Sequence, residues 1–177
     1  MGIVEKLRKG VATTSAEQTR ALAAELAASL PAVVTVALHG DMGVGKTTFV
    51  QGLAQGLGVT ERVTSPTFAI YSIHRGGSRP LIHLDAYRLE NERQIEELLL
   101  EDFLVGSYCL AVEWPEKLAG WLPADAWHLV LSIEDGDRHK LVLLPGPGLL
   151  AAPTRGPVPR TKNRRALSAR PAKKKAR

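Results

Sequence analysis

One short segment limits the folds open to this chain more than any other feature. Residues 40–47 fit the pattern G-x-x-x-x-G-K-[ST]. The glycines of this pattern let the backbone take positive φ angles, so that successive N–H groups can point toward one anion. A helix beginning at about Gly45 adds the positive end of its dipole. The pattern predicts a phosphate-binding loop formed by Gly40, Asp41, Met42, Gly43, Val44, Gly45, Lys46, Thr47 and Thr48.

Two side chains of this loop carry most of its chemistry. Lys46 would place a positive charge on the β- and γ-phosphates of a nucleotide, and Thr47 would offer a hydroxyl to Mg²⁺. An accidental glycine turn is the alternative interpretation. Against it, the loop directly follows the apolar run Val33–His39 and directly precedes a helical pattern that extends to about Leu57. A strand before the loop and a helix after it are what phosphate binding requires.

The remaining chain alternates extended and helical patterns. Thr14 or Ser15 can cap a helix over Glu17–Ser29. Strands in the first half alternate with helices, and hairpins follow later. This order predicts an α/β fold, a P-loop NTPase three-layer sandwich with a mixed, mainly parallel central sheet. Beyond Val33–His39, strands are expected over 67–74, 81–85, 108–112, 127–133 and 140–144, with a short helix over 94–100.

Charge divides the chain into two unequal parts. Of its 177 residues, the last 27 hold 10 Lys/Arg and no Asp/Glu, although the whole chain carries only +5. The first 150 residues are therefore mildly acidic, and the basicity belongs to a Pro-rich tail. That tail has too few apolar side chains to offset the entropy of ordering. We expect a P-loop ATPase domain over 1–148 and a disordered basic tail over 149–177.

The composition also bears on location. No apolar run approaches the roughly 20 residues of a transmembrane helix. Met1–Gly10 has no apolar core of a secretory signal. The single cysteine, Cys109, cannot form an intramolecular disulfide. These features predict a cytoplasmic protein without a membrane partner.

Two carboxylates at strand ends are candidates for the second half of the site. Phosphoryl transfer to water needs acidic groups that hold the metal or orient the water. Asp85 ends one expected strand, with His83 on the same face about 6.6 Å away. Glu113 ends another, and ligands of open α/β sheets gather beyond such ends. On spacing alone, Asp85 could equally cap the turn before Tyr87, and Glu113 could form a surface ion pair.

Other polar residues are weaker candidates. The hydroxyls of Ser65 and Thr67 could meet phosphate or water, but their chemistry alone favours a simple turn. Cys109 is expected to be plain core. His39 ends an expected strand and is expected to be structural as well. No zinc site is expected, because His74, His128 and His139 form no metal-ligand spacing.

Together, four motifs resemble the bacterial TsaE family, the ATPase of tRNA threonylcarbamoyladenosine biosynthesis. They are the loop at 40–48, Ser-Pro-Thr-Phe at 65–68, His-Leu-Asp-Ala-Tyr-Arg at 83–88 and Glu-Trp-Pro-Glu at 113–116. The resemblance covers about residues 12–144. It implies binding of ATP or ADP with Mg²⁺, and ATP hydrolysis that supports modification of the tRNA adenosine next to the anticodon. It also implies TsaB and TsaD as partners and tRNA through their complex, with the basic tail as a candidate aid.

The resemblance assigns roles to individual residues. Thr47 resembles a magnesium ligand, and Asp85 and Glu113 resemble the essential acidic pair that serves catalysis and the metal. Thr67 resembles the threonine of a switch-like loop that serves catalysis, and Trp114 a conformational element beside the nucleotide. The family's closing N-terminal segment corresponds here to Thr13–Thr19. Two further candidates for nucleotide contact are Thr14, in that segment, and Arg138, in the late hairpin turn.

Two other functions are open to such a sequence. A small-molecule P-loop kinase would need arginines in a lid, but Arg75 and Arg79 lie in an expected hairpin turn. A non-enzymatic nucleic-acid binder could act through the tail by salt-dependent, sequence-independent attraction. The tail has no aromatic residues on which bases could stack, so it predicts no reading of sequence.

Overall fold

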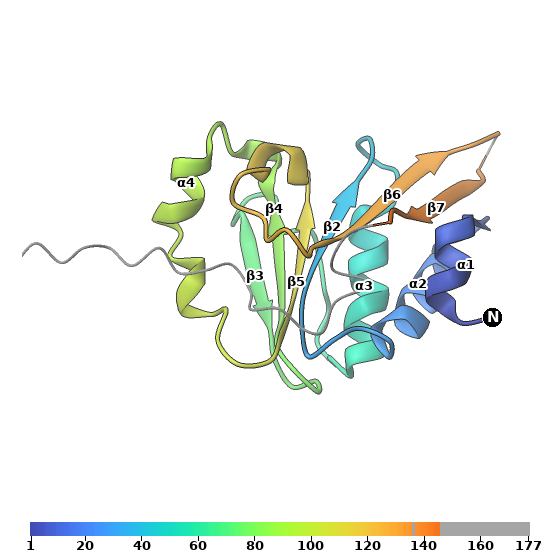
Figure 1. The fold of residues 1–177 in the computed structure, drawn as a ribbon, viewed down its shortest axis with the longest axis horizontal. Helices are drawn as coiled ribbons and strands as arrows, with labels where there is room; N and C mark the ends of the chain where they lie inside the picture. Colours follow the sequence, from blue (N-terminus) through green and yellow to red (C-terminus); the bar gives the residue numbers. More distant parts are fainter. Residues whose placement is uncertain (136, 146–177) are drawn as a thin grey trace, which may run out of the picture.

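A seven-stranded sheet organises this chain (Figure 1). The computed structural model describes residues 1–135 and 137–145, so the tail expected over 149–177 lies outside the described residues. The strand order is β1-β7-β6-β2-β5-β4-β3. The strands are β1 Val11–Thr13, β2 Val33–His39, β3 Tyr71–His74, β4 Leu81–Asp85, β5 Tyr108–Glu113, β6 Trp127–Ile133 and β7 His139–Leu143.

The centre of the sheet is parallel and its edges are antiparallel. Strands β6, β2, β5 and β4 run in one direction. Strand β3 pairs antiparallel with β4, while β7 and β1 complete the other edge in antiparallel fashion. The predicted mixed sheet is thus confirmed. The parallel strands β2, β4 and β5 are buried on both faces, which is why they read as continuous apolar runs.

Helices cover both faces of the sheet and give the three predicted layers (Figure 1). One face packs against α1, α2 and α3, and the other against α4 and the 3₁₀ turns. No helix in the described ranges is long and apolar enough to cross a membrane. The helices are α1 Ile3–Lys9, α2 Ala16–Ala27, α3 Lys46–Leu57 and α4 Glu92–Glu97, and the 3₁₀ turns are η1 Ala86–Arg88, η2 Leu100–Asp102 and η3 Pro115–Leu118.

Helix α3, which carries the predicted lysine and threonine, is held closely against α2. A Cβ atom added at Gly52 would lie 2.3 Å from the backbone oxygen of Arg20, and one at Gly56 would lie 2.5 Å from that of Ala24. Only glycine therefore permits this approach, because such distances are far inside van der Waals contact. The helix that follows the phosphate loop is fixed in position by a neighbouring helix as well as by the sheet.

The strand expected over 67–74 is wrong at its beginning. Residues 67–70 form a turn, and β3 begins only at Tyr71. The Ile70 amide donates to the Pro66 carbonyl at 2.6 Å, and Ile70 has a φ of 69°. The hydroxyl groups of Ser65 and Thr67 bind a carboxylate of β4. The turn's own backbone bond and the hydroxyl bonds to β4 therefore replace strand pairing over these residues.

Three other elements differ from the sequence prediction. The helix expected over 94–100 begins earlier, because the Asn91 side chain caps it by accepting from the Arg93 amide. It also ends earlier, at Glu97, and Leu98 and Leu99 separate it from η2; Leu99 has a φ of 52°. Helix α1 and strand β1 were not predicted at all.

Candidate functional site

The phosphate loop joins β2 to α3 at the edge where the parallel strands end. Gly40, Gly43 and Gly45 have φ angles of 134°, 78° and 99°. A Cβ atom at Gly40 would lie 2.3 Å from the backbone oxygen of Leu131, so this glycine packs against β6. At Gly43 or Gly45 it would meet nothing within 4 Å. The latter two therefore border open space at the start of a helix, where an anion is stabilised.

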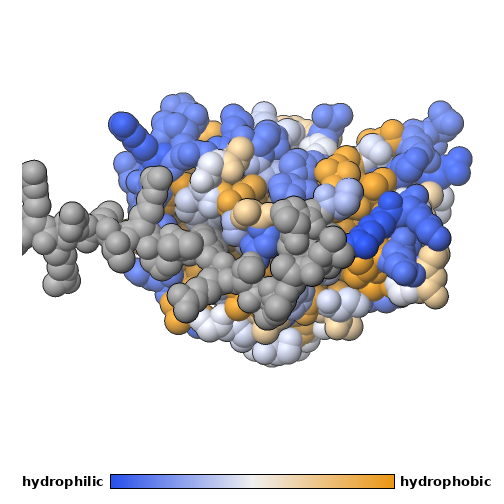
Figure 2. Space-filling view, viewed as in Figure 1, coloured by the Kyte–Doolittle hydropathy of each residue, from blue (hydrophilic) through white to orange (hydrophobic). Residues whose placement is uncertain are grey.

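The edge that holds this loop is polar. In Figure 1 the strands β2 and β5 point toward the upper edge of the molecule, and hydrophilic groups predominate along that edge in Figure 2. Gly45 is the N-cap of α3, and no side chain caps the helix there. The first backbone N–H groups of an uncapped helix carry its positive partial charge. The loop and the helix start together form a suitable place for phosphate.

Lys46 is a buried cation at the base of the loop. Only 4% of it is exposed, and its Nζ donates to the backbone carbonyls of Gly40 and Asp41 at 2.5 and 2.8 Å. The same atom lies 4.0 Å from the centroid of a Trp114 ring. Burial lowers the pKa of Lys46, and the nearby Glu113 carboxylate opposes that shift most strongly. A phosphate would supply the negative charge that this ammonium group lacks in direct contact.

Glu113 is the central acidic group. It is 4% exposed, which excludes the surface ion pair that its spacing left open. Its Oε1 accepts hydrogen bonds of 2.8 Å from the Thr47 hydroxyl and from Nε2 of His83. Since Thr47 donates its proton to the carboxylate, lone pairs of its oxygen are left for a cation. The hydroxyl expected to bind magnesium therefore lies directly beside a buried carboxylate.

Asp85 lies next to Glu113 across the β4–β5 pairing. Its Oδ2 accepts from Thr67 at 2.8 Å and from Ser65 at 3.3 Å. Its Oδ1 accepts from the Tyr87 amide at 3.0 Å, so Asp85 does cap the turn that follows it. The two interpretations of Asp85 are compatible, because a carboxylate can cap a turn and still border a neighbouring site. The turn formed by Ser65 and Thr67 is tied directly to this carboxylate.

Trp114 has an unusual backbone at the end of β5. Its φ of 58° lies in the left-handed region, which is a genuine outlier for a bulky residue. Its ring covers Lys46 and stacks at an angle on Tyr87, with centroids 5.1 Å apart. Such strain costs about 1–3 kcal/mol and concentrates at functional sites. The structure thus places the Trp114 ring beside the lysine of the loop.

The remaining two predicted residues make other contacts. Thr14 uses its backbone N and its hydroxyl to bind Gln18 Oε1 at 2.8 and 3.2 Å. Arg138 lies 3.7 Å from Glu134 in an exposed ion pair. The neighbouring His139 does reach the loop, with its Nδ1 3.0 Å from the Val44 carbonyl. Sequence reasoning considered His139 only as a metal ligand and missed this contact.

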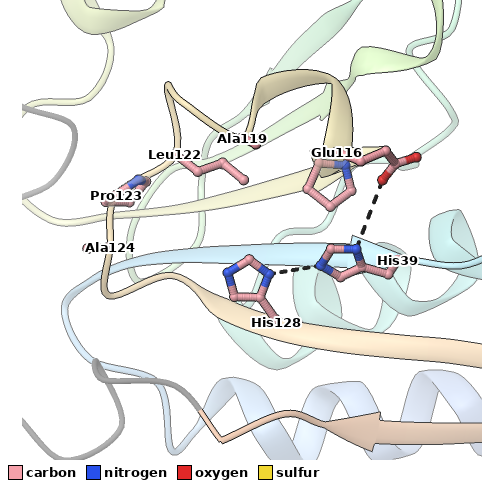
Figure 3. Close-up of a pocket in the computed structure, with 8 residues that line it drawn as sticks. His39, Glu116, Ala119, Leu122, Pro123, Ala124 and His128 are labelled. Carbon is pink, nitrogen blue, oxygen red and sulfur yellow. Dashed lines mark hydrogen bonds and ion pairs between the residues drawn. The ribbon is translucent and has the colours of Figure 1, made fainter.

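A second histidine cluster lies on the other face of the sheet (Figure 3). His39 ends β2 just before the loop, and its Nε2 lies 2.8 Å from Nδ1 of His128. Its Nδ1 lies 3.9 Å from the Glu116 carboxylate. Burial lowers the pKa of both imidazoles. These side chains line a pocket together with Pro115, Ala119, Leu122, Pro123 and Ala124.

Cys109 is core, as expected. It is fully buried in β5, and burial raises the pKa of its thiol to about 12. A thiol with so high a pKa is not a nucleophile at neutral pH. His83, by contrast, is a site residue to which sequence reasoning assigned no role, although it placed His83 on the same face as Asp85.

Comparison with known proteins gives a consistent set of relatives. The family model for threonylcarbamoyl adenosine biosynthesis protein TsaE matches residues 13–141. The protein of Bacillus subtilis (strain 168) named tRNA threonylcarbamoyladenosine biosynthesis protein TsaE is 37% identical over 129 residues, which are 73% of this chain and 80% of that protein. Its namesake in Aquifex aeolicus (strain VF5) is 36% identical over 137 residues, 76% of this chain and 93% of that protein. The crystal structure of Bacillus subtilis YdiB matches with a TM-score of 0.63 and 32% identity, over 76% of this chain and 82% of that one.

Proposed function

This chain belongs to the TsaE family of tRNA threonylcarbamoyladenosine biosynthesis, and on that premise we propose that it is an ATPase. It binds and hydrolyses ATP with Mg²⁺ to support threonylcarbamoyl modification of the tRNA adenosine next to the anticodon. One observation carries the hydrolytic part of this proposal. The buried Glu113 carboxylate lies 2.8 Å from the hydroxyl of Thr47, the residue directly after the phosphate-loop lysine. A hydrogen bond thus connects the proposed phosphate loop to a buried carboxylate.

The loop holds the phosphates of ATP or ADP. Open space adjoins Gly43 and Gly45, which leaves room for phosphate beside the backbone N–H groups of the loop. Lys46 exchanges its two carbonyl acceptors for phosphate oxygens, which bind an ammonium group more strongly. Trp114 lies over that lysine, so its ring borders the place proposed for phosphate.

Oxygen atoms are available for the metal. Thr47, Asp85 and Glu113 present one hydroxyl and two carboxylates, the hard ligands that Mg²⁺ prefers. A metal held by these residues would supply positive charge against the charge that develops on the phosphate oxygens. Glu113 in addition orients the attacking water or accepts its proton, since a buried and fixed carboxylate can do so. Thr67 couples the loop of Ser65 to Asp85 and thereby to the metal.

Two residues at the margin complete the proposed nucleotide site. Thr14 contacts the nucleotide if the Thr13–Thr19 segment closes over it, which requires exchange of its bonds to Gln18. Arg138 reaches it only by leaving Glu134. The hairpin that carries Arg138 is anchored to the loop through His139, so it is suitably placed.

The proposed setting is a complex in the cytoplasm. TsaB and TsaD are the protein partners, and tRNA is engaged through them. The family match ends at residue 141, before the tail whose last 27 residues hold 10 basic side chains. We assign that tail an auxiliary role in the encounter with tRNA, since such charge attracts nucleic acid without sequence preference.

The decisive experiment measures ATP hydrolysis by this chain alone and with TsaB, TsaD and tRNA. We expect weak hydrolysis alone and stimulation in the complex. A small-molecule kinase would instead transfer the phosphoryl group to a metabolite and leave little free phosphate. Arg79, a candidate for the lid of a kinase, donates to the carbonyls of Leu30 and Pro31 and not to the loop. Absence of hydrolysis in the presence of all partners would refute the proposal.

A further inference from the structure

His83 is a fully buried histidine that phosphate binding does not use. It lies within β4, between β3 and β5, and none of its surface is exposed. Its Nε2 lies 2.8 Å from Oε1 of Glu113. Its Nδ1 is buried and has no hydrogen-bond partner among the described residues. Buried polar atoms are rarely left in this way, so the arrangement calls for a physical reason.

The contacts determine where the proton of His83 resides. An ionised carboxylate only accepts hydrogen bonds, so Nε2 must carry the hydrogen that points to Glu113. Nδ1 has no acceptor within reach, so its place offers nothing to a donor. An imidazole with a proton on Nε2 therefore fits the hydrogen bond to Glu113.

This hydrogen bond complements the one from Thr47. The two donors reach the same oxygen of Glu113 from different elements, Thr47 from α3 and His83 from β4. A glutamate side chain has several rotatable bonds and is otherwise free to swing toward the phosphates or away from them. Two donors on one oxygen hold the carboxylate at a fixed distance from the hydroxyl that would hold Mg²⁺.

We propose that His83 is a positioning residue for Glu113: its Nε2–H donates to this carboxylate and holds it beside Thr47. The inference rests on the proposed ATP hydrolysis and names a residue that it requires. His83 does not touch the nucleotide in this arrangement. Its contribution therefore belongs to turnover and not to nucleotide affinity.

Three variants separate positioning from packing. The amide nitrogen of Gln can occupy the place of Nε2, whereas that of Asn corresponds to the place of Nδ1 and does not reach Glu113. Leu keeps much of the volume and removes both polar atoms. His83→Gln should retain kcat within a few fold, while His83→Asn and His83→Leu lose about ten- to a hundredfold in partner-stimulated kcat. KM for ATP should change little in all three.

The comparison of Gln with Asn decides the matter even if the Leu variant fails to fold. Both amides are polar and neutral, so a histidine needed only for packing would give them similar rates. Equal kcat for His83→Gln and His83→Asn, each folded by circular dichroism, would overturn the proposal. Parental kcat in His83→Leu would do the same.

A measurement on the chain alone does not depend on hydrolysis. Two-bond ¹H–¹⁵N correlation spectra show which imidazole nitrogen carries a proton, and the His83 signals can be assigned by their loss in His83→Gln. We expect a proton on Nε2, and a shift of the His83 signals in Glu113→Gln. A His83 without a proton on Nε2 would overturn the proposal. If Nε2 carries this proton but no partner-stimulated hydrolysis occurs, the proposed ATPase function fails while the placement of His83 holds.

Discussion

Two glutamate–histidine pairs lie close together in this chain but on opposite faces of the sheet. Glu113 with His83 faces α3, and Glu116 with His39 faces the pocket of Figure 3. The side chain of Glu113 is 6% exposed and its Oε1 lies 2.8 Å from the imidazole, whereas that of Glu116 is 53% exposed and 3.9 Å away. The same residue types thus form one fixed, desolvated pair and one loose pair that water screens.

The buried pair of Glu113 and His83 is where we expect chemistry. In a desolvated place each hydrogen bond to a carboxylate is strong, and an unpaired partner is costly. At a half-exposed place an ion pair contributes little, because water solvates both groups. The inner pair also contacts the hydroxyl of Thr47, while the outer pair contacts a second histidine, His128. Five predictions test this difference and the site around the inner pair.

The largest effect is expected at the two glutamates. Glu113→Gln keeps the shape and removes the charge, and it should lower partner-stimulated kcat on the order of 10²–10⁴-fold with ATP affinity nearly unchanged. Glu116→Gln is the matched control on the outer pair and should stay within about twofold. Phosphate release and nucleotide titration on both variants provide the measurement. Full hydrolysis by Glu113→Gln would leave the inner carboxylate a structural group.

The next effect concerns binding instead of turnover. Lys46→Ala removes a charge-assisted contact to phosphate and should weaken ATP binding about ten- to a hundredfold. Lys140→Ala serves as a control, because that lysine is exposed and pairs with Glu134. Titration with a fluorescent ATP analogue measures both affinities. Parental affinity in Lys46→Ala would show that the loop does not bind phosphate as proposed.

Asp85 should show a smaller effect that involves the metal. Asp85→Asn removes a charge next to Glu113 but can still cap Tyr87 through its remaining oxygen. We expect the Mg²⁺ concentration for half-maximal hydrolysis to rise about tenfold. Thr67→Val removes only the hydroxyl that binds Asp85, and it should raise that concentration less. An unchanged magnesium requirement in Asp85→Asn would restrict this residue to capping.

The sequence predicted the parts of the site that are local in the chain. The loop, β2 and α3 adjoin one another, so a motif and two apolar patterns were sufficient. The side-chain contacts between strands could not be predicted in this way. His83 and Glu113 are 30 residues apart in the chain, and His39 and His128 are 89 apart. Their contacts depend on the registers of β4 with β5 and of β2 with β6.

The errors in the fold have a similar origin. Strand β1 has only three residues, and it exists because Val11 pairs with Leu141 near the other end of the described chain. No local pattern marks so short a strand. The residues before β3 carry a strand-like sequence, but Thr67 binds Asp85 and turns the chain. In each place a contact between distant residues prevailed over local propensity.

The smallest predicted effect concerns the pH dependence of folding, through His39 of the outer pair and its neighbour His128. Burial lowers the pKa of both His39 and His128 from the ordinary value of 6.5. Below about pH 6.5, these two histidines therefore bind protons more readily in the unfolded chain than in the folded one, so acid favours unfolding. The stability that the two neutral imidazoles contribute is complete above that pH and is lost as the pH falls. The midpoint of thermal unfolding should thus decrease between about pH 7 and about pH 5, and less in a chain that carries both His39→Gln and His128→Gln.

Glu116→Gln tests the same pair from its other side. The Glu116 carboxylate raises the pKa of His39 and thus opposes the effect of burial. Without that charge, His39 should resist protonation more strongly, and the decrease in unfolding midpoint with acid should become slightly steeper. The change should be small, because Glu116 is half exposed and 3.9 Å away. An equal slope in the parent, in Glu116→Gln and in the double histidine variant would mean that the outer pair does not couple to folding. A flattened slope in Glu116→Gln would mean that the carboxylate does not raise the pKa of His39.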